Sequence, residues 1–248
     1  MMNMKSRHVT AVTTVLAALL ALAVSPAGAQ TAPNRQDRML EEIAADYRAT
    51  AYLTGRHRMS AALQAALARV PRHAFVPDAV VDYAYVNRPL SIGHGQTISQ
   101  PFIVALMSDL LDVEPGCSVL EIGTGSGYQA AVLAELGASV YSIEIVVPLA
   151  EEAATRLREL GYTNVEVKAG DGNYGWPEAA PFDRIIVTAG GRLPPALLDQ
   201  LAAGGKLIIP LESSHGEQVL TLFEKSPDGE VSQRAVLPVR FVPITGDT

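Results

Sequence analysis

The amino-acid sequence predicts an α/β protein with a mostly parallel, doubly wound sheet, antiparallel C-terminal strands and an N-terminal helical arm. From residue 117 onward, short apolar runs alternate with helical patterns, which is typical of parallel strands joined by right-handed crossovers. After Pro210 the helical patterns stop and two strand-like runs remain. The 248 residues are 48% hydrophobic and 18% charged, as expected for one well-packed domain with an appended segment.

Residues 1–29 have the pattern of a signal peptide. A basic start (K-S-R-H) precedes an apolar run over 11–24, and small residues (A-G-A) end at Ala29. The run is about 14 residues long, short of the ~20 that span a bilayer. We therefore expect cleavage after Ala29, no membrane span in the mature chain, and an exported, periplasmic protein. The alternative is a cytoplasmic protein that starts at Met39.

The segment after the leader predicts a linker and a helical arm. Residues 30–38 are mostly polar and are expected to form a flexible linker. Within the arm, 39–94, apolar residues at helical spacing predict a helix over 39–53. Ser60 is suited to cap a second helix over 61–70, which a proline ends.

The main domain is expected over 95–248. Pro101 fits the first turn of a helix that runs to about residue 111. The elements predicted after it, in chain order, are a strand at 117–122, a helix at 127–136, a strand at 139–144, a helix at 148–160, strands at 164–168 and 183–188, a helix at 195–202, and strands at 205–210, 218–225 and 232–242. A Pro-Asp-Gly turn makes the last two strands antiparallel neighbours.

The segment 119–129 (V-L-E-I-G-T-G-S-G-Y-Q) predicts a nucleotide-type cofactor site. An apolar strand runs into Gly123, Gly125 and Gly127, and a helix follows. Glycine permits a positive φ and close backbone approach, and a helix N-terminus offers free N–H groups. The alternative is a tight structural turn in an unrelated α/β domain.

Two acidic residues and the glycine spacing indicate which cofactor the site binds. The glycines are spaced G-x-G-x-G, whereas a dinucleotide fingerprint is G-x-G-x-x-G. Glu121 shortly precedes the first glycine, and Glu144 ends the next strand, where a carboxylate accepts hydrogen bonds from ribose hydroxyls in doubly wound folds. The combination favours S-adenosyl-L-methionine over NAD.

Charge and residue counts exclude other classes. The formal net charge of −7 argues against a nucleic-acid partner, since phosphate binding needs a basic surface. Cys117 is the single cysteine, so no disulfide framework is possible, and the five histidines lack ligand spacing. We expect no metal, and a monomer.

A second constellation lies at 88–101 (R-P-L-S-I-G-H-G-Q-T-I-S-Q-P), just upstream of the glycine segment. This loop is rich in glycine and hydroxyl groups and contains Thr97 and Ser99. Its position fits a lid or substrate wall near the cofactor. The alternative is an ordinary connecting loop with a helix cap at Ser99.

The segments 95–101 (G-Q-T-I-S-Q-P) and 119–129 together resemble the protein-L-isoaspartate (D-aspartate) O-methyltransferase family. The resemblance runs from about Met59 to Thr245. Four more segments agree with it: 70–77 (V-P-R-H-A-F-V-P), 170–172 (G-D-G), 181–189 (P-F-D-R-I-I-V-T-A) and 239–245 (V-R-F-V-P-I-T). It implies a Rossmann-like class I methyltransferase fold that uses S-adenosyl-L-methionine.

The resemblance also implies roles for individual residues. Ser99 matches the serine of the family's T-I-S motif, its active-site residue. Glu144 would hold the ribose, and Asp171 with Gly172 resembles the adenine-side motif. The remaining residues expected to bind the cofactor are Thr97, Ile98, Glu121, Gly123, Thr124, Gly125, Gly127 and Thr245.

The implied reaction is methyl transfer to the α-carboxylate of L-isoaspartyl residues, and to D-aspartyl residues, in damaged proteins and peptides. The ester would then pass through a succinimide back to aspartyl, which is protein repair. Phe102–Ile103 and Gly190–Arg192 depart from the family pattern, so the resemblance does not predict the rim of the substrate pocket. The alternatives are a small-molecule methyltransferase, a non-catalytic exported binding module and, third, a nicotinamide dehydrogenase.

Overall fold

The computed structural model describes residues 34–246, so the expected signal peptide and the start of the expected linker lie outside the described residues. The expected linker over 30–38 extends too far, because residues 35–38 are helical. Asn34 accepts a hydrogen bond of 2.8 Å from the N–H of Asp37 and thereby caps helix α1, Arg35–Thr54. The helix ends at Gly55, whose φ of 71° is left-handed.

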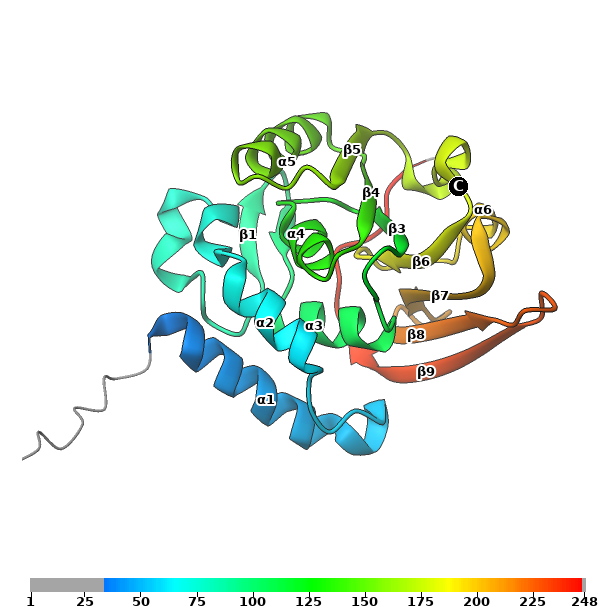
Figure 1. Ribbon diagram of the computed structural model, residues 1–248, viewed down its shortest axis with the longest axis horizontal. Coiled ribbons are helices and arrows are strands. Elements are labelled where there is room, and N and C mark those ends of the chain that lie inside the picture. The colour runs from blue at the N-terminus through cyan, green and yellow to red at the C-terminus, as the bar shows by residue number, and fades with distance from the viewer. Residues whose placement is uncertain (1–33, 247–248) are drawn as a thin grey trace, which may run out of the picture. The chain divides into compact units, whose positions relative to one another are not determined.

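The arm and the main sheet follow the predicted order (Figure 1). Upstream of the sheet lie α2 (Ala61–Arg69), η1 (Arg72–Phe75), η2 (Asp78–Tyr83), β1 (Leu90–Gly93), β2 (Gln96–Ile98) and α3 (Pro101–Leu110). The main domain continues with β3 (Ser118–Ile122), α4 (Tyr128–Glu135), β4 (Ser139–Glu144), α5 (Val147–Glu159), β5 (Val165–Ala169), η3 (Gly172–Tyr174), η4 (Pro177–Ala179), β6 (Phe182–Val187), α6 (Pro195–Asp199), β7 (Leu201–Glu212), β8 (Gln218–Lys225) and β9 (Val231–Val239).

The main sheet has the order β5-β4-β3-β6-β7-β8-β9. The first five of these strands are parallel, and β8 and β9 are antiparallel, as the sequence predicts. From β3 the chain moves outward to β5 and then returns to β6 on the other side of β3. This reversal leaves a crevice at the carboxyl ends of β3 and β6, where ligands bind in open α/β sheets.

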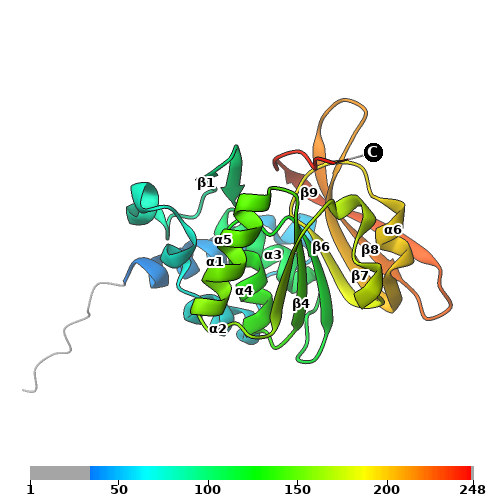
Figure 2. The ribbon, with the colours of Figure 1, turned by 90° about the horizontal axis from the view of Figure 1, so that it is seen from above.

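Helices cover both faces of the sheet (Figure 2): α1 to α5 lie on one face and α6 on the other. Residues of β3 alternate between the two cores, because successive strand side chains point to opposite faces. Val119 packs with the larger helical face, whereas Leu120 and Ile122 pack on the α6 face. By this alternation Glu121 points to the same face as Val119.

Two local elements differ from the sequence-based expectation. The loop expected over 88–101 contains an antiparallel hairpin, in which Leu90 pairs with Ile98. Helix α6 ends at Asp199 and strand β7 begins at Leu201, earlier than expected. The reason is sheet pairing: the N–H of Phe182 donates to Gln200 O at 2.9 Å, which draws the chain into the ladder beside β6.

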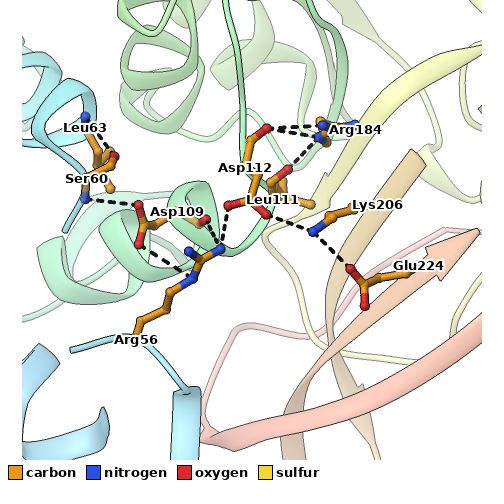
Figure 3. Close-up of polar contacts among 9 residues, drawn as sticks. All are labelled: Arg56, Ser60, Leu63, Asp109, Leu111, Asp112, Arg184, Lys206 and Glu224. Atoms are coloured by element: carbon orange, nitrogen blue, oxygen red, sulfur yellow. Dashed lines mark hydrogen bonds and ion pairs between the residues drawn. The ribbon is translucent and has the colours of Figure 1, made fainter. Parts of the chain in front are cut away.

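A charged network fastens the helical arm to the sheet (Figure 3). Asp112, just after α3, forms ion pairs with Arg56 of the α1–α2 connection and, at 2.8 Å, with Lys206 of β7. Lys206 also pairs with Glu224 of β8 at 3.0 Å. Arg184 of β6 donates to the backbone carbonyls of Leu111 and Asp112. The end of α3 is therefore held from both sides. None of the helices within 34–246 is long and apolar enough to cross a membrane.

Candidate active site

A cavity opens at the switch point of the sheet. The loop after β3, the end of β4 and the residue after β6 meet there, together with the β2 loop and the C-terminal segment. Its lining includes nine of the twelve residues expected from the sequence, namely Thr97, Ile98, Ser99, Gly123, Thr124, Gly125, Glu144, Gly172 and Thr245. Segments up to about 150 residues apart in the sequence thus form one site.

The glycine loop is shaped by a close approach to Thr188. Gly123 has a φ of 96°, and a Cβ atom there would lie 2.5 Å from Thr188 Oγ1. That hydroxyl donates to the carbonyl oxygens of Gly123, at 2.7 Å, and of Ile122, at 3.0 Å. Only glycine fits this position, and the loop is tied to the end of β6.

Glu144 braces the glycine loop from the end of β4. Its carboxylate accepts hydrogen bonds from the N–H groups of Gly125, at 2.8 Å, and Val146, at 2.9 Å. The side chain is 5% exposed and lines the cavity. Each carboxylate oxygen keeps a second lone pair, so the group can accept further hydrogen bonds from a ligand.

Glu121 lies beneath the cavity and does not line it, contrary to its expected place in the cofactor site. It is completely buried, and one carboxylate oxygen accepts a hydrogen bond from Ser142. The Ser142 hydroxyl lies 2.6 Å from that of Thr124, which faces the cavity. Burial raises the pKa of Glu121 to about 8, and the charge of Glu144 adds to the rise against the lowering effect of the Ser142 hydrogen bond.

Gly127 and Asp171 also lie outside the cavity lining. Gly127 has a φ of 86° at the start of α4, and a Cβ atom there would lie 3.1 Å from Leu157 of α5. Glycine is therefore needed for helix packing at this position. Asp171 caps η3 by accepting from Asn173 N–H at 2.9 Å, and the backbone of Gly246 lies against its carboxylate.

A groove continues from the cavity on the side of the helical arm. Thr97, Ser99, Thr188 and Val242 line both spaces and mark their junction. The other groove residues are Asp46, Thr50, Pro89, Gln100, Phe102, Ile103, Leu237, Pro238, Val239, Arg240 and Phe241. The departure at Phe102–Ile103 therefore lies in the groove wall, and helix α1 contributes Asp46 and Thr50 to the same groove.

The second departure, Gly190–Arg192, positions the C-terminal segment. Gly190 N–H donates to Val242 O at 2.8 Å, and Gly190 O accepts from Ile244 N–H at 2.7 Å. A side chain at Gly190 would overlap that of Gln218, and one at Gly191 would overlap Ile244. The glycines let the segment run beside the end of β6, which brings Thr245 to the cavity.

Several lining residues were missed from the sequence. The most informative are Thr188, Tyr128 and Gln129. Tyr128 and Gln129 directly follow the glycine motif, so their position was a usable signal. Thr188 is recognisable only once β6 lies beside β3, because no local pattern marks it. Among residues 34–246, no group of His, Cys, Asp and Glu side chains is placed to hold a metal ion.

The comparisons with known proteins agree with this geometry. The family described as protein-L-isoaspartate(D-aspartate) O-methyltransferase matches residues 52–248. Protein-L-isoaspartate O-methyltransferase 1 of Cupriavidus necator is 54% identical over 237 residues, covering 94% of this chain and 91% of its own. Protein-L-isoaspartate O-methyltransferase 2 of a Polaromonas species is 56% identical over 209 residues, covering 84% and 99%.

Solved structures show the same fold. A protein-L-isoaspartate O-methyltransferase is 30% identical with a TM-score of 0.73, over 83% of this chain and 66% of that longer one. A putative protein-L-isoaspartate O-methyltransferase from Plasmodium falciparum, solved with S-adenosyl-L-homocysteine, has a TM-score of 0.68 over 83% and 98%. At 24% identity this second likeness bears on the fold alone. By family match, close relatives and fold, the chain belongs to the protein-L-isoaspartate(D-aspartate) O-methyltransferase family.

Proposed function

We propose that this chain is a protein-repair methyltransferase. It transfers a methyl group from S-adenosyl-L-methionine to the free carboxylate of damaged residues in proteins and peptides, which is the α-carboxylate in L-isoaspartyl and the side-chain carboxylate in D-aspartyl residues. One observation carries this beside the family membership: a glycine-loop cavity and a groove meet at Thr97, Ser99 and Thr188. A donor and an acceptor can thus face each other across one junction.

The residues of the cavity fit a nucleoside cofactor. Gly123 and Gly125 present backbone without side chains, and Glu144 lines the cavity with free lone pairs for ribose hydroxyls. Gly172 and Thr245 complete the lining in this proposal. When bound, S-adenosyl-L-methionine supplies a methyl group on a positively charged sulfur.

The acceptor needs positioning more than activation. A free α-carboxyl has a pKa of about 3.5, so it is already an anion at neutral pH and needs no general base. Ser99 is proposed as the catalytic residue, because its hydroxyl at the junction can donate to this carboxylate and replace lost water. Thr97 offers a second hydroxyl there. Catalysis would rest on alignment in a water-poor site.

The later repair steps need no residue of this chain. The amide nitrogen next to the methyl ester attacks the ester carbonyl, methanol leaves, and a succinimide forms. Water then opens the succinimide, partly to normal aspartyl. The role of this chain therefore ends with ester formation.

The test is methyl transfer to an L-isoaspartyl peptide, with the same peptide containing normal L-aspartate as the matched control. We expect transfer to the first and not to the second. If S-adenosyl-L-methionine binds but neither peptide is methylated, the small-molecule methyltransferase is favoured. If no S-adenosyl-L-methionine binds at all, the protein is a binding module.

We further propose that the protein is exported and acts as a monomer. The support for export is the basic, apolar and small-residue pattern that ends at Ala29. We expect Gln30 as the N-terminus of the protein recovered from the periplasm. Recovery from the cytoplasm with an N-terminus at Met39 would contradict export. Sedimentation of the purified protein checks the monomer.

A further inference from the structure

The arm contains a buried arginine that the proposed chemistry leaves unused. Arg72, at the start of η1, is completely buried. None of the ion pairs within 34–246 includes it. A guanidinium stays charged in proteins, and a buried charge without a counter-ion is strongly unfavourable.

One hydrogen bond of Arg72 is made to Ser99, at the junction of cavity and groove. Its Nη2 donates to the carbonyl oxygen of Ser99 at 2.7 Å, and its Nε donates to that of Ala84 at 2.8 Å. The guanidinium therefore joins the arm to the residue proposed as catalytic. Because it holds the backbone of Ser99, it fixes where the Ser99 side chain begins.

The third nitrogen of the guanidinium, Nη1, lacks a hydrogen bond of normal geometry. Nη1 and the hydroxyl of Tyr128 are both buried without a hydrogen bond of normal geometry, although the two side chains interact with each other. The guanidinium carbon lies 4.6 Å from the centre of the Tyr128 ring, which lines the cofactor cavity. Burial lowers the pKa of Arg72, and only tyrosines act against this effect. The positive charge is thus held beside the junction with no carboxylate to balance it.

We propose that Arg72 is a positioning residue that holds Ser99 by its backbone and makes this site prefer a carboxylate to a neutral group. This inference rests on the proposed function, in which the acceptor is a carboxylate next to Ser99. Arg72 lines neither the cavity nor the groove, so an acceptor carboxylate beside Ser99 would balance its charge without direct contact, where residues 34–246 form no ion pair with it. The two roles separate chemically, because lysine keeps the charge but not the two-armed hydrogen bonding of arginine.

The experiment compares two peptide ligands. One contains L-isoaspartate, and the other carries a carboxamide in place of its α-carboxylate, so it has the same shape without the charge. Their Kd values are measured with S-adenosyl-L-homocysteine present, so that no turnover occurs. The full-length protein is compared with Arg72→Met, Arg72→Lys and the control Arg69→Met, which removes an exposed arginine from α2.

We expect wild type and Arg69→Met to prefer the carboxylate peptide. Arg72→Met should lose about tenfold or more of this preference, the effect of one charge in a partly buried site, with the Kd of S-adenosyl-L-homocysteine nearly unchanged. Arg72→Lys should keep most of the preference but lower kcat, because Ser99 is held less firmly. An unchanged preference in Arg72→Met would overturn the electrostatic role, since a merely structural arginine affects both peptides equally.

Two further results of the experiment have a defined meaning. If Arg72→Met does not fold, Arg72→Lys decides, and a wild-type kcat in that variant overturns the positioning role. If the wild-type protein fails to methylate the isoaspartyl peptide, the proposed function fails instead. The inference about Arg72 fails alone when wild type is active and the variants match it in both kcat and carboxylate preference.

Discussion

The carboxylate of Glu144 accepts a hydrogen bond of 2.8 Å from the backbone N–H of Gly125. The end of β4 thereby holds the centre of the glycine loop, 19 residues away in the sequence. The second oxygen accepts from Val146 N–H at the start of α5. One side chain thus connects the loop, a strand end and a helix N-terminus, and it lines the cavity that they enclose.

Replacing Glu144 tests its proposed contact with the ribose. Glu144→Ala removes the acceptor for Gly125 N–H and for the ribose hydroxyls, so we expect the Kd for S-adenosyl-L-methionine to rise by about tenfold or more. Titration calorimetry measures it. The exposed Glu152, on α5, provides the control Glu152→Ala, which should bind normally. An unaltered Kd in Glu144→Ala would rule out the ribose assignment.

Replacing Ser99 tests the acceptor side. In Ser99→Ala we expect kcat on an isoaspartyl peptide to fall by about tenfold or more, because the carboxylate loses a hydroxyl donor. Binding of S-adenosyl-L-methionine should change little. Ser91→Ala, in the same hairpin but exposed and outside both spaces, is the matched control. A wild-type rate in Ser99→Ala would refute a catalytic role for Ser99.

The contact between Gly123 and Thr188 predicts a costly substitution. Gly123→Ala should lower the free energy of unfolding by about 2 kcal/mol or more, since it combines a strained φ with a steric clash. Gly229→Ala separates the two causes, because Gly229 has a φ of 93° but nothing within 4 Å of its added Cβ. Urea unfolding of both variants measures the difference. Equal losses in the two would show that the clash contributes nothing.

The buried Glu121 predicts a pH dependence of stability. Its pKa of about 8 in the folded chain lies above its usual 4.5, so the folded state binds more protons in this range. The free energy of unfolding should therefore fall as the pH rises through this window. Between about pH 5 and about pH 8, wild type should lose at least about 1 kcal/mol more than Glu121→Gln. Parallel curves for the two proteins would contradict this prediction.

The network around Asp112 predicts the opposite pH dependence. Burial alone would raise the pKa of Asp112, but hydrogen bonds from Lys206 and Arg56 outweigh it and lower the pKa. This contribution is present at neutral pH and is lost as the pH falls below the usual 3.8. Asp112→Asn should cost about 1 kcal/mol at neutral pH, because the site is partly exposed. Thermal unfolding should show this loss shrinking in acid, and a constant difference would argue against the ion pairs.

Much of the fold could be predicted because its signals are local. The apolar runs that became β3 and β4 have their expected lengths to within a residue, since burial on both faces requires a continuous apolar strand. Ser60 caps α2 through Leu63 N–H, as its sequence position indicates. The start of α1 was missed because Asn34 is an equally good cap within a stretch that is polar throughout.

The sequence motif predicts the position of those site residues that belong to one strand–turn–helix unit. Gly123, Gly125 and Glu144 line the cavity, because a strand–turn–helix places them there in any doubly wound sheet. Glu121 does not line the cavity, because strand alternation turns its side chain to the face that carries α4. Gly127 was expected to face the cofactor but instead accommodates Leu157, a contact that depends on how α5 packs.

The sequence by itself determined the class of protein and the cofactor-type turn, because short motifs fix local backbone geometry, whereas Ser99 was expected from the resemblance to a family. Only the tertiary structure decided that Thr188 joins the two halves of the site and that the chain end closes one wall of the cavity. It also decided that Arg72 is buried against Ser99 and forms no ion pair with any of residues 34–246. These contacts join segments that are far apart in the sequence, and tertiary packing alone brings such segments together.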